Sequence, residues 1–482
     1  MLARRIGWQG LLLSLAVACG RTEVRPGALD DAASGTNGVG GAGASAGAGA
    51  GGGGMTSGGF AGGLVAVPGA GGQGALEQFL PLLGQEVSVT AIAASKDGRV
   101  AVGGNFRGRV DFGGHVLNTE AEGGWGFVAV YDSAGRLSWA KIPVNGAGSV
   151  TGLSFAPDGG LVAQGTIGTM FLPDAPVVTY VVKLASLGEQ AWDTRLAEHS
   201  AFAGKLVTDS RGDVWAGAQS WQPVEADDPV NDIIYLYHLS SKGSLLETQR
   251  VSGQGCVDNR LTDLTISSDD HLIATAGCTD AGGARSAFMQ ERDVLGTTLL
   301  EKRFVGVLNF SAGDMVVSVD SKRRITTGGG FWGSFTLDGL LFSDDSMSGM
   351  SRVWLASFDP SGKLDRHDVY RTRSGAVAAL AYDPNDDLLV LATCQGLDIS
   401  GTVINYEPEH GDSAVCVVKV DRSGLVLIWN HAIEGDLHPT VLVSDSTGHV
   451  WIGGNFYKEA WYGSRRIPGN EAAGGLLLRL NP

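Results

Sequence analysis

A repeated unit, running from Val89 to the C-terminus, constrains the fold of this 482-residue chain more than any other feature. Each copy reads as a strand hairpin, a long link and a second hairpin. The clearest copy is VTAIAASKDGRVAVGGNF (Val89–Phe106) with FVAVYDSAGRLSWAKI (Phe127–Ile142), and a late copy is VAALAYDPNDDLLVLATC (Val377–Cys394) with AVCVVKVDRSGLVLIW (Ala414–Trp429). One four-stranded unit cannot bury both of its faces, so the copies must pack on one another.

The turns of the first hairpins count the copies. Seven turn dipeptides follow one another at intervals of 53 to 63 residues: Asp97-Gly98, Asp158-Gly159, Arg211-Gly212, Asp269-Asp270, Lys322-Arg323, Asn385-Asp386 and Thr447-Gly448. Such turns between apolar flanks are a strong hairpin signal. In the second hairpins, Asp132 precedes Gly135 and Asp421 precedes Gly424 by three residues. There the Asp binds the turn backbone and the Gly adopts a positive φ. We expect an all-β chain of seven four-stranded antiparallel sheets.

The seventh copy stops after LLLRL (Leu476–Leu480) and lacks a fourth strand. An apolar segment, EQFLPLLG (Glu77–Gly84), precedes the first hairpin at the distance expected of a fourth strand. We therefore expect this N-terminal strand to complete the last sheet, which closes a ring and removes open sheet edges. The alternative is an open solenoid, which requires polar caps that neither end resembles.

The stretch GGNFRGRVDFGGHVL (Gly103–Leu117) followed by GGWGFVAVYDSAGRLSWAKI resembles the bacterial seven-bladed β-propeller repeat family, often abbreviated SBBP. The fifth copy (Gly328–Phe342) and the seventh (Gly453–Ile467) resemble it in part, and the second to fourth keep only the strand pattern. The resemblance covers most of residues 77–482. It implies a seven-bladed β-propeller over residues 76–482, and it supplies no shared catalytic residues.

The first 18 residues have the pattern of a signal peptide, with Arg4 and Arg5 before a short apolar run, LLLSLAVA (Leu11–Ala18). AVAC (Ala16–Cys19) resembles a bacterial lipobox, in which the Cys becomes the lipidated first residue. Ala16 replaces the usual Leu, so plain cleavage with an unmodified Cys19 stays open as an alternative. Residues 19–75 are expected to be a Gly/Ala-rich disordered linker. These features predict a lipid-anchored protein of the bacterial cell envelope (outer membrane, periplasmic or surface-facing), or a secreted one without lipidation.

Removing Cys19 leaves four cysteines, an even number that suits an oxidising compartment. Cys256 precedes the first strand of the fourth copy and Cys278 ends the second. Cys394 ends the second strand of the sixth copy and Cys416 begins the third. We predict two disulfides within single sheets, Cys256–Cys278 and Cys394–Cys416; four buried thiols are the alternative.

Metal and enzyme signals are weak. Asp383, Asn385 and Asp387 in DPNDD suggest calcium, but no following Gly or bidentate Glu completes a loop, so a turn is the preferred interpretation. The cysteines and histidines lack zinc-ligand spacing. A net charge of −16 argues against nucleic acid as a partner. We expect no cofactor and no metal, and the sequence favours a non-enzymatic protein.

The links between second and third strands are the longest segments of each copy, and antiparallel alternation places them at one end of the sheets. Long loops on a rigid scaffold often carry binding function. Aromatic and acidic residues there suit protein or carbohydrate contacts: Trp221, Asp227, Asp228, Asp232, Trp332, Asp344, Asp345, Tyr406, Tyr457, Trp461 and Tyr462. The alternative for the aromatics, notably Phe106, Phe331 and Phe456, is packing of the sheet ends.

The predicted function is therefore that of a monomeric binding or interaction scaffold that contacts a protein or carbohydrate of the cell envelope. One alternative is an envelope polysaccharide hydrolase or lyase, with acidic residues at a central channel. Another is a role in outer-membrane protein assembly, which rests on analogy of fold alone.

Overall fold

Antiparallel β-strands make up all the regular structure in the part of the chain that the computed structural model describes. That part comprises residues 76–119, 123–146, 148–168, 177–196, 202–220, 233–306, 315–343, 352–371, 375–393, 395–399, 402–405, 414–422, 427–462, 465–468 and 474–481. The expected all-β class is confirmed for these residues. The expected signal peptide, Cys19 and the linker lie outside them. Among the described residues, no helix is long and apolar enough to cross a bilayer.

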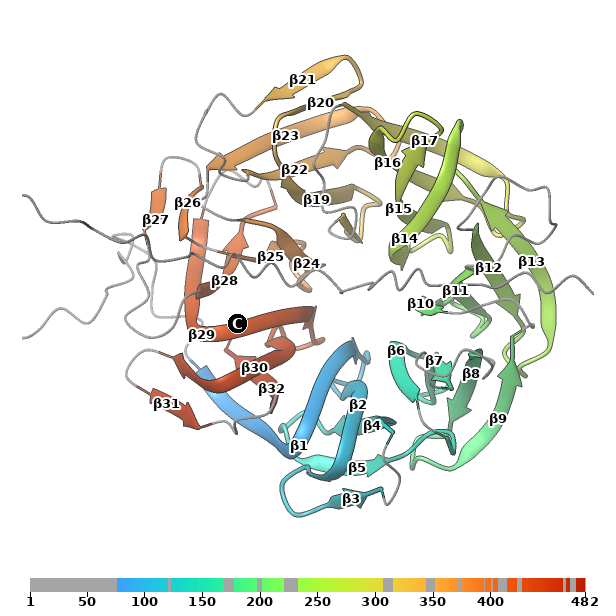
Figure 1. Ribbon diagram of the computed structural model, residues 1–482, viewed down its shortest axis with the longest axis vertical. Coiled ribbons are helices and arrows are strands. Elements are labelled where there is room, and N and C mark those ends of the chain that lie inside the picture. The colour runs from blue at the N-terminus through green and yellow to red at the C-terminus, as the bar shows by residue number, and fades with distance from the viewer. Residues whose placement is uncertain are drawn as a thin grey trace, which may run out of the picture. The chain divides into compact units, whose positions relative to one another are not determined.

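The strands form four-stranded antiparallel meanders that follow one another in chain order (Figure 1). The first meander contains part of β1 (Leu76–Ala94), then β2 (Val100–Asp111), β4 (Trp125–Tyr131) and β5 (Leu137–Lys141). The next contains β6 (Gly148–Phe155), β7 (Leu161–Ile167), β8 (Val178–Leu184) and β9 (Gln190–Arg195). It is followed by β10 (Phe202–Thr208), β11 (Val214–Ser220), β12 (Ile233–Leu239) and β13 (Leu245–Val251).

The later meanders continue the same order. One contains β14 (Cys256–Ile266), β15 (Leu272–Asp280), β16 (Arg285–Arg292) and β17 (Thr298–Val305). The following one contains β18 (Val316–Val319), β19 (Ile325–Phe331), β22 (Arg352–Phe358) and β23 (Leu364–Arg371). Next come β24 (Val377–Tyr382), β25 (Leu388–Thr393), β28 (Ala414–Val420) and β29 (Leu427–Ser444). The last uses β29 again, with β30 (Val450–Tyr462), β32 (Gly474–Leu480) and the start of β1.

Short strands extend four of the links between second and third strands. They are β3 (Val116–Asn118) on β2, the hairpin of β20 (Ser334–Leu337) with β21 (Leu340–Ser343), the hairpin of β26 (Gln395–Ile399) with β27 (Thr402–Asn405), and β31 (Arg465–Pro468) on β30. The sequence predicts long loops at all of these links. In the structure β3 and β31 continue the sheets of their own meanders, β20 pairs with β17 of the preceding meander, and β26 with β27 forms a separate two-stranded sheet.

The link between β15 and β16 also departs from the expectation of a long loop. It is a tight turn in which the Asp280 carboxylate accepts hydrogen bonds from the N–H groups of Gly282 and Ala284, while Gly283 adopts a φ of 82°. The Asp and the two glycines supply the side-chain acceptor and the backbone freedom that a tight reversal requires. The expected ligand face therefore has no long loop in the fourth copy.

The first-hairpin turns share one backbone conformation. At the second residue of each predicted dipeptide φ is positive, from 63° to 89°, including the non-glycine residues Asp270, Arg323 and Asp386. The residue three positions earlier closes each turn with its carbonyl oxygen, as Ser95 does for Gly98 at 3.1 Å. The predicted turns are thus confirmed as one recurring element.

The long strand β1 belongs to two meanders. Its first half pairs with β32, from Leu76 opposite Leu480 to Leu82 opposite Gly475. Its second half pairs with β2, from Leu83 opposite Asp111 to Ala94 opposite Val100. The expected pairing of this segment with the last strand is present, and Figure 1 draws the blue start of β1 beside the red C-terminal strands.

Buried apolar side chains lie between successive meanders. Val128 of β4, for example, belongs to one cluster with Leu161 of β7 and Val182 of β8. Another cluster joins Trp451 of β30 with Val89 of β1. These clusters bury faces of the meanders that a single unit could not bury alone.

One predicted disulfide is confirmed. Cys256 at the start of β14 is bonded to Cys278 in β15, with a Cα–Cα distance of 5.5 Å. Cys416 is disulfide-bonded. Its predicted partner, Cys394, lies outside the described residues, so that pairing stays a prediction.

Candidate functional site

Most residues of the expected ligand face cannot be placed. Trp221, Asp227, Asp228, Asp232, Asp344, Asp345 and Tyr406 lie outside the described residues, as does the side chain of Tyr462. Trp332, Tyr457 and Trp461 are described. The face must therefore be judged from these three aromatic residues.

Two of the three are exposed and occupy the same position of the repeat. Trp332 and Tyr457 each follow a fully buried phenylalanine, Phe331 and Phe456, and their side chains are 44% and 39% exposed. Tyr457 also packs edge-on against His438, with ring centroids 5.7 Å apart. The Phe side chains are packed in the core, as the alternative interpretation expected, and the residue after each of them is exposed.

Trp461 is placed differently. It lies in β30 opposite Glu434 of β29 and is only partly exposed. Its candidacy as an exposed contact residue is therefore weaker than that of Trp332 or Tyr457.

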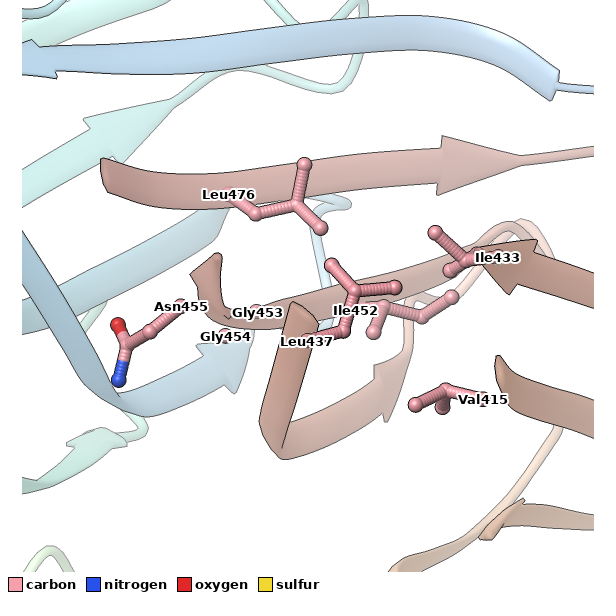
Figure 2. Close-up of a pocket in the computed structure, with 8 residues that line it drawn as sticks. All are labelled: Val415, Ile433, Leu437, Ile452, Gly453, Gly454, Asn455 and Leu476. Atoms are coloured by element: carbon pink, nitrogen blue, oxygen red, sulfur yellow. The ribbon is translucent and has the colours of Figure 1, made fainter. Parts of the chain in front are cut away.

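A small apolar pocket lies between the last two meanders (Figure 2). It is lined by Val415, Ile433, Leu437, Ile452, Gly453, Gly454, Asn455 and Leu476. Asn455 is its one polar side chain, and both ends of the amide are bonded across the seam, to the N–H of Val89 at 2.8 Å and to the hydroxyl of Ser88 at 3.0 Å. A ligand site needs polar groups that orient the ligand. We interpret this pocket as a packing seam.

At the opposite end of the sheets, four of the first-hairpin turns are built on a buried acidic residue. The carboxylates of Asp209, Asp320, Asp383 and Asp445 each accept hydrogen bonds from the backbone N–H groups two and four residues later. A short acceptor side chain satisfies turn N–H groups in this way. The recurring carboxylate is structural in all four turns.

The DPNDD segment illustrates the role of that carboxylate. Asp383 binds the N–H groups of Asn385 and Asp387, which confirms the interpretation as a turn. The ammonium group of Lys419, in the third strand of the same meander, lies 2.8 Å from Asp383 and 3.5 Å from Asp387. A lysine thus occupies the place between the two carboxylates.

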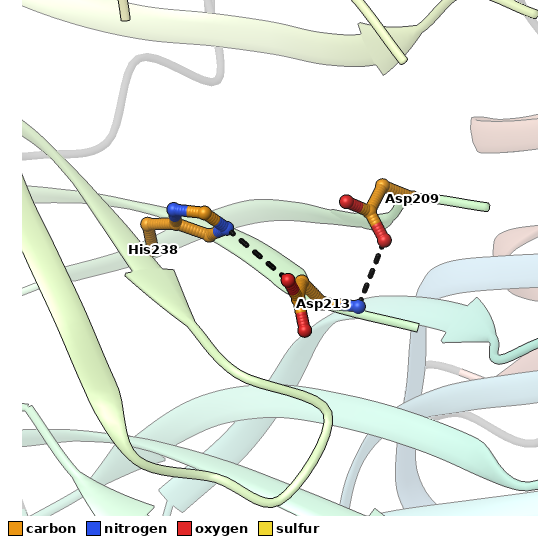
Figure 3. Close-up of side chains that lie close together, drawn as sticks. All are labelled: Asp209, Asp213 and His238. Atoms are coloured by element: carbon orange, nitrogen blue, oxygen red, sulfur yellow. Dashed lines mark hydrogen bonds and ion pairs between the residues drawn. The ribbon is translucent and has the colours of Figure 1, made fainter. Parts of the chain in front are cut away.

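In the meander of β10 to β13, His238 of β12 takes the position that Lys419 has in the later meander. Asp209, Asp213 and His238 have potential ligand atoms that all lie within 4.8 Å of one another (Figure 3). The Nε2 atom of His238 points toward the Oδ2 atom of Asp213, at 3.9 Å. His238 stacks on Trp215, with ring centroids 4.1 Å apart. Burial lowers the pKa of His238, against the opposing charges of the aspartates.

Arg211 neutralises part of this negative charge. Its guanidinium lies 2.7 Å from Asp209 and 3.7 Å from Asp213, and its side chain is 55% exposed. The aspartates raise the pKa of Arg211 through a hydrogen bond and the charge of Asp209. The guanidinium thus lies beside both carboxylates, whereas Nε2 of His238 has no hydrogen-bond partner among the described residues.

On the innermost strands, Asp263 of β14 is a carboxyl group whose pKa burial raises. Its Oδ2 atom accepts a hydrogen bond from the N–H of Val317 in the next meander at 3.0 Å, and its Oδ1 accepts one from Leu264 at 2.9 Å. The Oδ2 bond joins the inner strands of two meanders, and the Oδ1 bond is to the next residue of β14. This residue is a structural carboxyl group.

Sequence reasoning did not find the cluster of Asp209, Asp213 and His238. A signal was present, because an acidic residue opens four of the turns and recurs four residues later in two of them. The third member comes from a strand about 25 residues on, and its place opposite the turn depends on strand register.

No protein-family model and no curated protein matches the sequence. Among solved structures, a protein of unknown function from Dyadobacter fermentans is 11% identical with a TM-score of 0.45, covering 85% of this chain and all of its own. An ulvan lyase of polysaccharide lyase family PL25 is 9% identical with a TM-score of 0.45, covering 82% and 96%. The Hadza microbial sialidase Hz136 is 11% identical with a TM-score of 0.38, covering 84% and 95%. TM-scores below 0.5 are too low to assign this chain to any of these folds.

Proposed function

We propose that residues 76–482 form a closed seven-bladed β-propeller that serves as a binding scaffold of the bacterial cell envelope. The described residues contain seven buried apolar clusters, each between two neighbouring meanders. The cluster containing Trp451 and Val89 joins the last meander to the first. Across the same seam the hydroxyl of Thr440 donates to the carbonyl of Val89 at 2.7 Å. These contacts support a ring without open sheet edges.

The anchor follows from the N-terminal sequence. Cys19 carries the lipid, and the Gly/Ala-rich linker to residue 75 separates the propeller from the membrane surface. A Cys19→Ser variant is expected to move from the membrane fraction to the soluble fraction of cells, while the unaltered chain stays membrane-bound. Equal membrane association of both would contradict lipid anchoring.

Binding uses the end of the sheets where second and third strands are linked. The observation that carries this proposal is the pair of exposed aromatic side chains, Trp332 and Tyr457, at one repeat position. Large aromatic side chains dominate the energetics of many interfaces. The partner is a protein or carbohydrate of the envelope.

The experiment compares capture by three immobilised chains: the unaltered protein, Trp332→Ala/Tyr457→Ala, and Leu187→Ser. Leu187 is 77% exposed in the turn between β8 and β9, at the other end of the sheets, and controls for loss of exposed apolar surface. Envelope proteins and envelope polysaccharide are applied in separate arms. We expect the aromatic variant to lose at least about tenfold in capture of one of them, since a binding hot spot contributes about 2 kcal/mol or more. Equal capture by all three chains would refute the proposal.

The alternative of a polysaccharide hydrolase or lyase requires catalytic carboxyl groups at the centre of the propeller. Among the described residues, Asp263 is the inner-strand carboxyl group with a raised pKa, and both of its oxygens are bonded to backbone. This arrangement favours binding over hydrolysis. Release of reducing sugars from envelope polysaccharide by the purified chain would reverse that preference.

A further inference from the structure

The strongest unexplained group outside the expected ligand face is the cluster of Asp209, Asp213 and His238. Its two carboxylates and its imidazole come from the turn between β10 and β11 and from β12 (Figure 3). No role in the proposed binding face involves them, because they lie at the opposite end of the sheets. Another copy of the repeat has a lysine in place of this histidine, and the two sites can be compared directly.

The meander of β24, β25, β28 and β29 contains the same three positions. Asp383 and Asp387 correspond to Asp209 and Asp213, and Lys419 corresponds to His238. The side chains are 1%, 17% and 9% exposed in the histidine cluster and 2%, 18% and 8% in the lysine cluster. The two sites therefore share one geometry and differ in one side chain.

The hydrogen bonds of the carboxylates also match. Oδ1 of Asp209 accepts the N–H groups of Arg211 and Asp213, as Oδ1 of Asp383 does for its own turn. Oδ1 of Asp213 accepts the N–H of Ser241 at 2.8 Å, and Oδ1 of Asp387 accepts that of Arg422 at 3.2 Å. In both sites this leaves each Oδ2 atom directed into the space between the carboxylates.

What fills that space differs. In the lysine cluster an ammonium group lies 2.8 Å and 3.5 Å from the two Oδ2 atoms. In the histidine cluster the imidazole stops short, with Nε2 at 3.9 Å from Asp213, and the guanidinium of the half-exposed Arg211 reaches the two Oδ2 atoms instead, at 2.7 Å and 3.7 Å. Nε2 is buried and has no hydrogen-bond partner among the described residues, although His238 is only 7% exposed. A buried, unpaired ring nitrogen directed at two carboxylates is costly unless something binds it.

We propose that Asp209, Asp213 and His238 bind a divalent transition-metal ion, of which Zn²⁺ is the model case. Imidazole with carboxylates suits zinc and similar ions, whereas calcium and magnesium prefer oxygen ligands alone. The metal takes the place that the ammonium of Lys419 takes in the other meander, bonded to Nε2 and the two Oδ2 atoms. Trp215 holds the imidazole plane by stacking. Arg211, which is half exposed, swings outward to release Asp209.

The test measures Zn²⁺ and Co²⁺ binding to the purified full chain by titration calorimetry, with the visible absorption of Co²⁺ as a report on its ligands. Three variants accompany it: His238→Lys, Asp213→Asn and His115→Gln. His238→Lys reproduces the lysine cluster that this fold already accommodates. Asp213→Asn keeps an acceptor for the Ser241 N–H. His115 is an exposed histidine elsewhere and controls for adventitious surface binding.

We expect one Zn²⁺ per chain, with affinity reduced at least about tenfold in His238→Lys and in Asp213→Asn and unchanged in His115→Gln. Near-ultraviolet circular dichroism of each variant verifies its fold. Should His238→Lys not fold, Asp213→Asn alone decides. Absence of binding to the unaltered chain at millimolar Zn²⁺ would overturn the proposal, because the three residues would then be an imidazole beside two carboxylates and not a metal site. Equal binding by the His238→Lys or Asp213→Asn variant would overturn it as well.

Discussion

At the scale of single residues, three first-hairpin turns have a non-glycine residue at the positive-φ position, and its side chain contacts the preceding meander. Asp270 and Asp386 both adopt positive φ, and their carboxylates bind Ser210 and Ser321 of the preceding turn. Arg323, also at positive φ, contacts Glu291. Glycine is the residue that this backbone favours. The contacts between meanders offset the strain of the left-handed conformation.

Asp386 tests this balance. Asp386→Ala retains the strain and loses both bonds to Ser321, so we expect it to lower the free energy of unfolding by about 2 kcal/mol. Asp386→Gly loses the same bonds but relieves the strain, and we expect a loss below about 1 kcal/mol. Urea unfolding of both variants provides the measurement. A glycine variant as unstable as the alanine variant would show that strain plays no part.

Asp445 makes a prediction about pH. Burial by itself raises the pKa of its carboxyl group, but hydrogen bonds from Thr447 and from the Trp451 indole outweigh burial, so the pKa lies below 3.8. A carboxyl group with a lowered pKa in the folded state stabilises the protein above pH 3.8 and loses that contribution as the pH falls through the lowered value.

We therefore expect Asp445→Asn to cost about 2 kcal/mol at pH 7, because two kinds of donor lose a charged acceptor. The difference from the unaltered chain should shrink as the pH falls below 3.8 and through the lowered pKa of Asp445. Urea unfolding across this range measures it. A difference that does not change with pH would show that the charge of Asp445 contributes nothing.

At the scale of elements, the disulfide between β14 and β15 is the clearest case. It spans 22 residues within one hairpin and was expected from the order of the strands. Cross-linking a loop of this length restricts the unfolded chain by about 3 kcal/mol. We expect Cys256→Ser/Cys278→Ser to lower the free energy of unfolding by that amount while keeping the near-ultraviolet circular dichroism. A loss below about 1 kcal/mol would mean that the bond is dispensable.

The sequence predicts the hairpins because their signals are local: the turn dipeptides and the alternation around them lie within a few residues. The tight β15–β16 turn was not predicted, because the other copies of the repeat have a long link there. Asp280, Gly282 and Gly283 are typical turn residues and provided a local signal for it. The continuation of β2 into β3 was missed because Gly113 and Gly114 read as part of a loop. His238 was missed because its place beneath the turn depends on cross-strand register, which local patterns do not set.

At the scale of the whole molecule, stability depends on the seam between the first and last meanders. A single strand, β1, joins them, and the pairing partners lie about 400 residues apart in the chain. Such a contact is slow to form because a long loop must close first. Once formed, it covers the edge of β32, which would otherwise be open to pairing with another chain.

Amide hydrogen exchange of the purified protein, followed by mass spectrometry, tests closure of the ring most directly. If β1 completes the last blade, a peptide covering residues 76–84 is protected to a degree similar to the peptide of β32, because the N–H groups of both are held in sheet hydrogen bonds. Full exchange of residues 76–84 within seconds, beside slow exchange of β2, would mean that the segment is an unpaired tail and that the propeller is not closed.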